Sequence, residues 1–535
     1  MKTITLGLFL LFTLFARAWG CPPTKVPEAA PEAQVKEDGN KEITHSAPSP
    51  IEKKHPFSLL VFGGGYSPSG NQVSLESNVK YLRRIRSAMG LGEAEMKTFF
   101  ADGMDKGRDL QFFDPSFRIP EVNQIMAELL GSTRGIANQY RTNKLAPDDK
   151  SSIAAIDKWI ATRKRIGGDQ TNLVYFTGHG GKGDKKTPQN TSAYLWDNAR
   201  LKVSDFVKKI DQLPKEQACV FVMVQCYSGG FANVIFKEGD PKKGLSDHPR
   251  AGFFATVHDR VAAGCTPDIR EKNYKEYSTR FWEALCGESR IGKKVKKPDF
   301  DKDGKTSLAE AHAYVVLRSD TIDIPIKTSD VFLRKFSSLT PPKDAKEKAE
   351  PDSFCLVGEE LKELVKGASR ESKAVANGLS RKLSLNQPKR HEEAKKLLET
   401  LKKKRASIVT EKKKHDEERG KLKRSLAARL RKKWPELKNF HHPTVISLYR
   451  TANADEVKQT VDGDGSWKRY QELTTKSREK EKERFAIEKK EVLVMRLIRE
   501  LETIALEKNL PLVADQETVK RFEKLTELEH VILPD

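Results

Sequence analysis

The sequence predicts an α/β fold with a mostly parallel β-sheet, followed by an α-helical C-terminal region. Up to about residue 340, short apolar runs of strand length alternate with patterns typical of amphipathic helices. Strands that alternate with helices are typical of a parallel sheet covered on both faces, which is a three-layer sandwich. From about residue 388 the chain is dominated by Lys, Glu, Arg and Leu, which favours long helices.

The expected elements follow from local composition. The apolar run Phe57-Ser-Leu-Leu-Val-Phe62 predicts a strand, the glycine-rich segment 63–70 a loop, and a helix begins near Ser74. No Gly-Lys-Ser/Thr follows these glycines, so we interpret the loop as lining an active site and not as a phosphate-binding loop. Further strands are expected at 96–101, 172–178, 219–225 and 251–257, and helices at 120–131, at 148–164 and around Tyr277, Phe281 and Trp282.

Length and cysteine content limit the domain organisation. At 535 residues the chain is too long for one ordinary core, so two or three domains are expected. Six cysteines are few for an exported chain of this size, and a disulfide framework is not predicted. One bridge stays open among Cys219, Cys265, Cys286 and Cys355.

The N-terminus predicts export. Lys2, the apolar run 4–15 and the small-x-small pattern Ala16-Arg17-Ala18 are typical of a signal peptide over residues 1–18. Residues 19–56 are rich in Pro, Glu, Lys and Ala, and we expect a disordered linker. The protein is therefore expected in a periplasmic, extracellular or secretory compartment. Lipidation of Cys21, which would make it a lipoprotein, is the one route to a membrane tether that we keep open.

A histidine and a cysteine follow two of the predicted buried strands. His179 and Gly180 come directly after the apolar run 172–178, and Cys226 follows the run that begins at Cys219. Because reactive groups gather beyond the carboxyl ends of strands in open α/β sheets, these two side chains are expected to meet. An imidazole beside a thiol favours nucleophilic catalysis, and the backbone N–H groups of Gly180 and Cys226 are candidates for an oxyanion site.

These residues resemble those of the caspase-like cysteine peptidases, the group that includes caspases, legumains, metacaspases and gingipains. Those families place His-Gly after one strand and the nucleophilic Cys after the next. The segment Cys226-Tyr-Ser-Gly229 is most similar to the Cys-x-Ser-Gly of legumains and metacaspases. The resemblance covers roughly residues 57–340 and implies a caspase–haemoglobinase fold, with Cys226 as nucleophile and His179 as acid/base.

The residue preferred before the scissile bond stays open. Val224 stands where the resembled families usually carry an acidic or amide residue, two positions before the nucleophile. An acidic pocket would favour Arg or Lys in the substrate, and Asp259 or Asp268 are candidates to supply it.

A calcium loop is predicted at 299–310, inside the peptidase region. Carboxylates at positions 1, 3 and 5, glycine at position 6, a carbonyl at position 7 and glutamate at position 12 match the EF-hand loop. The predicted ligands are Asp299, Asp301, Asp303, Lys305 through its carbonyl, and Glu310. We expect a structural Ca²⁺ ion.

The C-terminal region is predicted to form an antiparallel helical hairpin with coiled-coil character. After a linker over 341–387, the basic helical region 388–535 contains helices at about 388–434 and 467–509. Residues 381–450 hold 23 Lys and Arg against 8 Asp and Glu, a net charge of +15. A solvated ion-paired face explains this charge, and attraction to an anionic surface or polymer is the alternative. No nucleic-acid-binding motif is visible. Resemblance to legumains implies that such a segment can mask the active site.

The sequence therefore predicts an exported cysteine endopeptidase that acts on a protein or peptide substrate through a thioester acyl-enzyme. The competing hypothesis is a catalytically inactive caspase-like protein that uses its basic helical region to bind a partner or polyanion.

Overall fold

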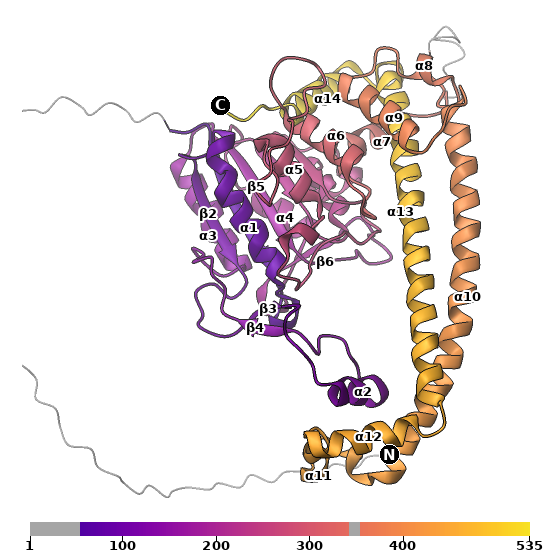
Figure 1. Ribbon diagram of the computed structural model, residues 1–535. Helices are drawn as coiled ribbons and strands as arrows, with labels where there is room; N and C mark the ends of the chain where they lie inside the picture. Colours follow the sequence, from indigo (N-terminus) through magenta and orange to yellow (C-terminus); the bar gives the residue numbers. More distant parts are fainter. Residues whose placement is uncertain (1–53, 342–353, 535) are drawn as a thin grey trace, which may run out of the picture. The chain divides into compact units, whose positions relative to one another are not determined.

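A six-stranded sheet organises the first part of the computed structural model, which describes residues 54–341 and 354–534 (Figure 1). The strand order is β11-β10-β9-β5-β1-β2. Five strands pair in parallel, and β11 is antiparallel to β10. The predicted mostly parallel sheet is thereby confirmed. The strands are β1 (Phe57–Gly64), β2 (Glu95–Phe100), β5 (Thr171–Gly178), β9 (Cys219–Met223), β10 (Arg250–Phe254) and β11 (Ile326–Lys327).

Side chains that alternate along each strand enter two cores on opposite faces of the sheet. In β9, Phe221 and Met223 belong to one core, and Val220 and Val222 to the other. The two-residue period of a strand produces this division, so the sheet is the middle of three layers. The first face packs on α3 (Ile153–Ile166), α4 (Val203–Ile210) and α7 (Thr328–Phe336), and the second on α1 (Val73–Ile85), α5 (Tyr277–Cys286) and α6 (Leu308–Arg318).

Smaller elements lie around the carboxyl ends of the strands and beyond. A 3-10 helix, Ser228–Ile235, follows Cys226. The strands β3 (Leu110–Phe112) and β4 (Gln139–Arg141) pair with each other, and the chain between them forms the helix α2 (Glu121–Leu130). A three-stranded sheet begins directly after His179: β6 (Gly180–Gly181), β7 (Ser192–Tyr194) and β8 (Arg200–Lys202).

Two long helices, α10 (Arg390–Lys433) and α13 (Ser466–Val513), form the expected antiparallel hairpin (Figure 1). Ion pairs join Arg405 to Glu491, Glu411 to Lys480 and Glu418 to Arg469. The residue numbers rise along α10 while those of the paired residues fall along α13, so the two helices are antiparallel. Pro511 does not end α13, which continues to Val513 around the buried Leu510. The other helices are α8 (Leu361–Leu364), α9 (Arg370–Lys382), α11 (Pro443–Leu448), α12 (Thr451–Asp462) and α14 (Gln516–Glu529).

The C-terminal helices contribute to the core of the sheet region. Val492, Leu506 and Leu510 of α13 and Phe522 and Leu525 of α14 are buried in the core on the first face of the sheet. The segment 341–387, expected as a linker, contains α8 and α9, and Leu364, Val375 and Leu379 pack there against α6 and α13. The apolar core thus crosses the expected boundary at residue 340.

The far end of the hairpin contacts α2. Val122, Ile125 and Leu129 of α2 are buried with apolar residues of α10, α12 and α13. Lys458 pairs with Glu121 at 2.7 Å, and the Tyr470 hydroxyl donates to Glu128. The hairpin is therefore fixed to the sheet region at both of its ends.

The export predictions lie outside the described residues. They concern the signal peptide 1–18, most of the linker 19–56, and lipidation at Cys21. Within 54–341 and 354–534, no helix combines the length and the apolar composition that crossing a bilayer requires.

Candidate active site

His179 and Cys226 lie beyond the carboxyl ends of the neighbouring strands β5 and β9. The two strands pair in parallel, with Phe176 opposite Met223. Gly180 touches the segment of Cys226, since a Cβ at Gly180 would lie 2.2 Å from the Cys226 carbonyl oxygen. The structure thus places Gly180, the residue after His179, against Cys226, and only glycine fits between the two segments.

The imidazole of His179 is held through one ring nitrogen. Nε2 lies 2.8 Å from the carbonyl oxygen of Gly70 and 2.9 Å from Oε1 of Gln72. The amide nitrogen of Gln72 donates to the Ser69 carbonyl at 3.0 Å, which keeps Oε1 turned toward the ring. Because both neighbours of Nε2 are acceptors, Nε2 carries the hydrogen, and Nδ1 of the neutral ring is left as an acceptor.

Burial lowers the pKa of His179, and the hydrogen bond to Gly70 only partly opposes this. A neutral imidazole at neutral pH is the form that accepts a proton from a thiol.

Gly70 belongs to the glycine-rich loop after β1, which the sequence predicted to line the site. Sequence patterns did not identify Gln72, because one glutamine at a helix start carries no signal of its own.

The thiol of Cys226 contacts the loop after β10. Its sulfur accepts from the backbone N–H of Ala262 at 3.4 Å and lies 3.8 Å from the Ala262 carbonyl oxygen. Burial raises the pKa of Cys226, and the nearby Asp323 carboxylate adds to the rise. In the described part of the chain no hydrogen bond joins Cys226 to His179. Cys226 is thus a protonated thiol at neutral pH.

Alkylation of Cys226 should accordingly rise with pH and show no plateau below pH 8. A thiol with a pKa above its ordinary value of about 8.5 is less than about 3% thiolate at pH 7, and its reaction rate climbs roughly tenfold per pH unit. Iodoacetamide rates mapped to single cysteines between pH 5 and 10 check this, with the fully buried Cys219 as the unreactive control. A plateau below pH 7 would instead reveal a preformed thiolate.

Asp323 holds the loop that contacts Cys226, and sequence analysis did not find it. Its Oδ1 accepts from the Ala263 N–H at 2.6 Å, whereas the buried Oδ2 has no partner among the described residues. The backbone carbonyl of Asp323 accepts from Nε of Arg496, a buried residue of α13, at 2.7 Å. Arg496 also donates to the carbonyls of Val316, Ser319 and Thr321.

A second contact joins α13 to the same loop. Arg260 pairs with Glu488 of α13 at 3.5 Å, and the Arg260 carbonyl accepts from the N–H of Tyr227. The sulfur of Cys226 and the N–H of Tyr227 are therefore both held by loop 260–263, and this loop is tied to α13. The sequence signal for Arg496 was a single charged residue inside the apolar run 492–498.

The structure also places the other cysteines and the two aspartates suggested for an acidic pocket. The five described cysteines are all free, including the four for which a bridge was left open. Asp268 is bound by Arg270 and Asn273, and Arg270 holds the pKa of Asp268 well below its usual range. Asp259 is exposed. Cys265 lies in the site, with its sulfur 3.7 Å from the Gly178 carbonyl oxygen.

The predicted calcium loop brings three of its carboxylates together. One oxygen each of Asp299, Asp301 and Asp303 lies within 4.8 Å of the others, and all three residues are exposed. Gly304 has a φ of +83°, the sharp turn that the loop requires. This donor set fits a hard cation. Lys305, predicted to bind through its carbonyl, donates its N–H to Asp303 at 2.8 Å.

Glu310 is placed differently from the expected twelfth ligand. Its carboxylate accepts from the N–H of Phe300, and from the N–H and hydroxyl of Ser307, with which it forms the capping box of α6. The sequence Ser-x-x-Glu satisfies the capping pattern and the EF-hand pattern at once, so the sequence alone does not separate the two roles.

Comparisons with known proteins give limited matches. No family model matches the chain, and no curated protein matches it. Among solved structures, caspase-1 from Spodoptera frugiperda is similar with 12% identity and a TM-score of 0.24, over 44% of this chain and 68% of that chain. A structural genomics target protein from Geobacter sulfurreducens is similar with 10% identity and a TM-score of 0.23, over 45% of this chain and 92% of that chain.

Proposed function

We propose that the protein is a caspase-like cysteine endopeptidase with Cys226 as nucleophile and His179 as acid/base. The observation that carries this proposal is the hydrogen bonding of His179. Gly70 and Gln72 hold Nε2–H and leave Nδ1 as a proton acceptor at the strand end next to that of Cys226. A resting thiol needs such a base at the moment of attack, because it is not ionised beforehand.

The reaction would proceed in two halves. The sulfur of Cys226 attacks the peptide carbonyl, and its proton passes to Nδ1 of His179. The backbone N–H groups of Gly180 and Cys226 donate to the oxyanion. The imidazolium then protonates the leaving amine, which leaves a thioester on Cys226. Water attacks the thioester with His179 as base, releasing the carboxylic acid and restoring the thiol. The carbonyl of Gly70 and Oε1 of Gln72 stabilise the imidazolium by accepting from Nε2–H.

Peptide cleavage by the full chain tests the proposal. A mixed peptide library, read by mass spectrometry, should be cleaved by the wild-type protein and not detectably by Cys226→Ala. The matched control is Cys286→Ala, the same substitution at the half-buried cysteine that ends α5, and it should retain cleavage. Cleavage that persists in Cys226→Ala would refute the nucleophile. A folded wild-type protein that cleaves nothing would favour a binding function.

A binding protein without catalysis is the second candidate function. The raised pKa of Cys226 and the lack of a hydrogen bond to His179 within the described residues favour it. The partner would be an anionic surface or polymer that contacts the basic segment 381–450, where Lys403 and Lys404 of α10 are exposed. Retention on heparin that falls steeply with salt, and that is lost when exposed lysines of α10 become glutamine, would support this function.

We further propose that the loop 299–310 binds Ca²⁺ with a structural role. Calcium should raise the melting temperature, because an ion that binds the folded chain at 100 times its Kd stabilises it by about 2.7 kcal/mol. Asp301→Asn should abolish the shift, since Asp301 is the central carboxylate of the three. Asp259→Asn, a change at an exposed aspartate outside the loop, should leave the shift intact. An unchanged calcium shift in Asp301→Asn would refute the site.

A further inference from the structure

The three-stranded sheet that begins after His179 presents positive charge next to the candidate active site. Residues 180–202, which form β6, β7, β8 and their connections, contain five Lys and Arg and two Asp. All five cations are exposed, and no ion pair joins any of them to a carboxylate in the described part of the chain. They are Lys182, Lys185, Lys186, Arg200 and Lys202.

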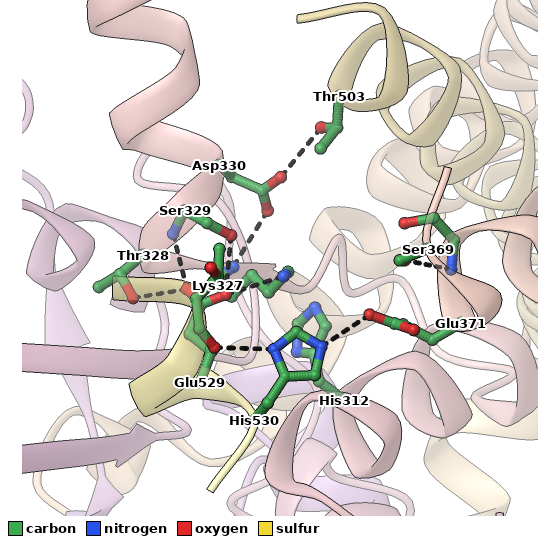
Figure 2. A network of polar contacts seen from close by, with 12 residues as sticks. His312, Lys327, Thr328, Ser329, Asp330, Ser369, Glu371, Thr503, Glu529 and His530 are labelled. Carbon is green, nitrogen blue, oxygen red and sulfur yellow. Dashed lines mark hydrogen bonds and ion pairs between the residues drawn. The ribbon is translucent and has the colours of Figure 1, made fainter. Parts of the chain in front are cut away.

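Charged side chains are paired where α13 packs on α7, α9 and α14. Figure 2 shows His530 facing Glu371, and the two are joined at 2.8 Å. Lys327 pairs with Glu529, also at 2.8 Å. The protein thus satisfies its charges internally at that place, and the sheet after His179 differs from it.

The two aspartates of residues 180–202 have other partners. Asp197 pairs with Lys150, outside this sheet, at 3.4 Å. Asp184 accepts through Oδ1 from the N–H of Thr187 at 2.8 Å and from its hydroxyl at 2.9 Å, which closes the connection between β6 and β7. The five cations are therefore free to contact a negatively charged ligand.

The antiparallel register places two of these cations on the face that carries the side chain of His179. The N–H of Tyr194 donates to the His179 carbonyl at 2.9 Å, and Tyr194 lies opposite Arg200 of β8. Side chains directly opposite each other in antiparallel strands share a face, so His179, Tyr194 and Arg200 form a row across the sheet. Lys202, two residues further along β8, shares this face, and Leu201 between them is buried on the other.

Aromatic contacts support this row. The guanidinium of Arg200 lies over the Tyr194 ring, 5.2 Å from its centroid. Tyr194 meets Tyr66 edge to face at 5.6 Å, and Tyr66 meets the His179 ring in the same way at 5.3 Å. The cation is thus linked to the proposed catalytic imidazole by packed rings.

Lys182 approaches the nucleophile from the connection after β6. Its Nζ lies 5.6 Å from the centroid of the Tyr227 ring, and Tyr227 directly follows Cys226. A cation over an aromatic face is attracted to the ring and keeps its charge. Positive charge therefore lies near both members of the proposed catalytic pair.

We propose that Lys182, Arg200 and Lys202 bind acidic side chains of the peptide substrate on one side of the scissile bond, an inference that rests on the proposed peptidase function. Arg200 and Lys202 are two residues apart on one strand, which is about 6.6 Å. Glu or Asp at alternate positions of an extended peptide have the same spacing, so two such residues match two cations. Because β8 is two strands, about 10 Å, from His179, these acidic residues are expected about three positions from the cleaved bond.

Binding of two matched peptides to the full chain tests the proposal without peptide hydrolysis. The probes are a fluorescein-labelled peptide of alternating Glu and Ala and its counterpart with Gln in place of Glu. Fluorescence anisotropy is measured with the Cys226→Ala protein, so that neither peptide is cut. We expect the Glu peptide to bind more tightly, with an affinity that falls as salt is added, because exposed charges are screened.

Variants of the cations locate the bound peptide. Arg200→Gln/Lys202→Gln should weaken binding of the Glu peptide about fivefold, and Lys182→Gln about twofold, as expected for exposed ion pairs. Lys403→Gln/Lys404→Gln, the same change of charge at exposed positions of α10, is the matched control and should bind like the parent protein. All these positions are exposed, so the melting temperature should stay unchanged in each variant.

Three binding results would overturn the proposal: equal binding of the Glu and Gln peptides, unchanged affinity in both variants of the sheet, or loss of binding in the α10 control alone. Cleavage of a peptide library by the wild-type protein without enrichment of Asp or Glu near the cut bonds would also overturn it. A protein that binds the Glu peptide through these cations but cleaves nothing would instead refute the peptidase function and leave the acidic-peptide site in place.

Discussion

Deletion of residues 341–535 should produce a chain that does not fold. The deletion removes Val492, Leu506 and Leu510 of α13 and Phe522 and Leu525 of α14, all buried in the core on one face of the sheet. Burial of an apolar side chain of this size contributes roughly 1.5–3 kcal/mol. The five together contribute about 8–15 kcal/mol, which equals the whole stability of an ordinary domain.

Solubility and the unfolding transition of the truncated chain measure this effect. We expect aggregation, or no cooperative transition. A control deletion that replaces residues 414–477 with a short glycine–serine turn removes the far part of the hairpin and keeps the core residues, and it should fold. A soluble truncated chain with raised peptidase activity would show instead that the helical region is a removable mask, as resemblance to legumains implied.

Arg496→Ala should destabilise the protein strongly and lower its activity. The guanidinium donates to four backbone carbonyls, and one of these belongs to Asp323, which holds Ala263 beside Cys226. Each buried acceptor left without a donor costs about 1–3 kcal/mol. We expect a loss on the order of 4 kcal/mol in the free energy of unfolding, measured by denaturant titration. Lys490→Ala, at an exposed position of α13, should change stability little.

Asp323→Asn separates positioning from folding. The amide oxygen of asparagine can still accept from Ala263, so the loop is retained, whereas the negative charge near Cys226 is removed. Because that charge helps to raise the pKa of the thiol, alkylation of Cys226 at pH 7 should become faster. Unchanged alkylation in this variant would show that Asp323 does not act on the thiol.

The sequence predicted those parts of the fold that depend on local patterns. The apolar runs after residues 56, 171 and 218 became the central strands β1, β5 and β9. The periodic, charged segments became α10 and α13. The placement of His179 and Cys226 at neighbouring strand ends followed from the parallel sheet alone.

The remaining features depend on contacts between distant segments. Arg496 is one charged residue in an apolar run, and only the packed structure shows which carbonyls it reaches. Glu310 fits two overlapping motifs. Only the structure shows that its carboxylate accepts from the backbone N–H groups of Phe300 and Ser307, as a capping residue of α6 does. Segment 341–387 was expected to be a linker, yet Val375 and Leu379 are buried because α6 and α13 lie against them.

Covalent trapping of the nucleophile tests the central claim most directly. The full chain is treated with peptidyl chloromethyl ketones that end in Arg, Asn or Asp, and the adducts are mapped by mass spectrometry. We predict one adduct, on Cys226, with a rate that falls about 10²–10⁴-fold in His179→Ala. Labelling spread equally over Cys226, Cys265 and Cys286, or a Cys226 rate unaffected by His179→Ala, would contradict the Cys226–His179 peptidase.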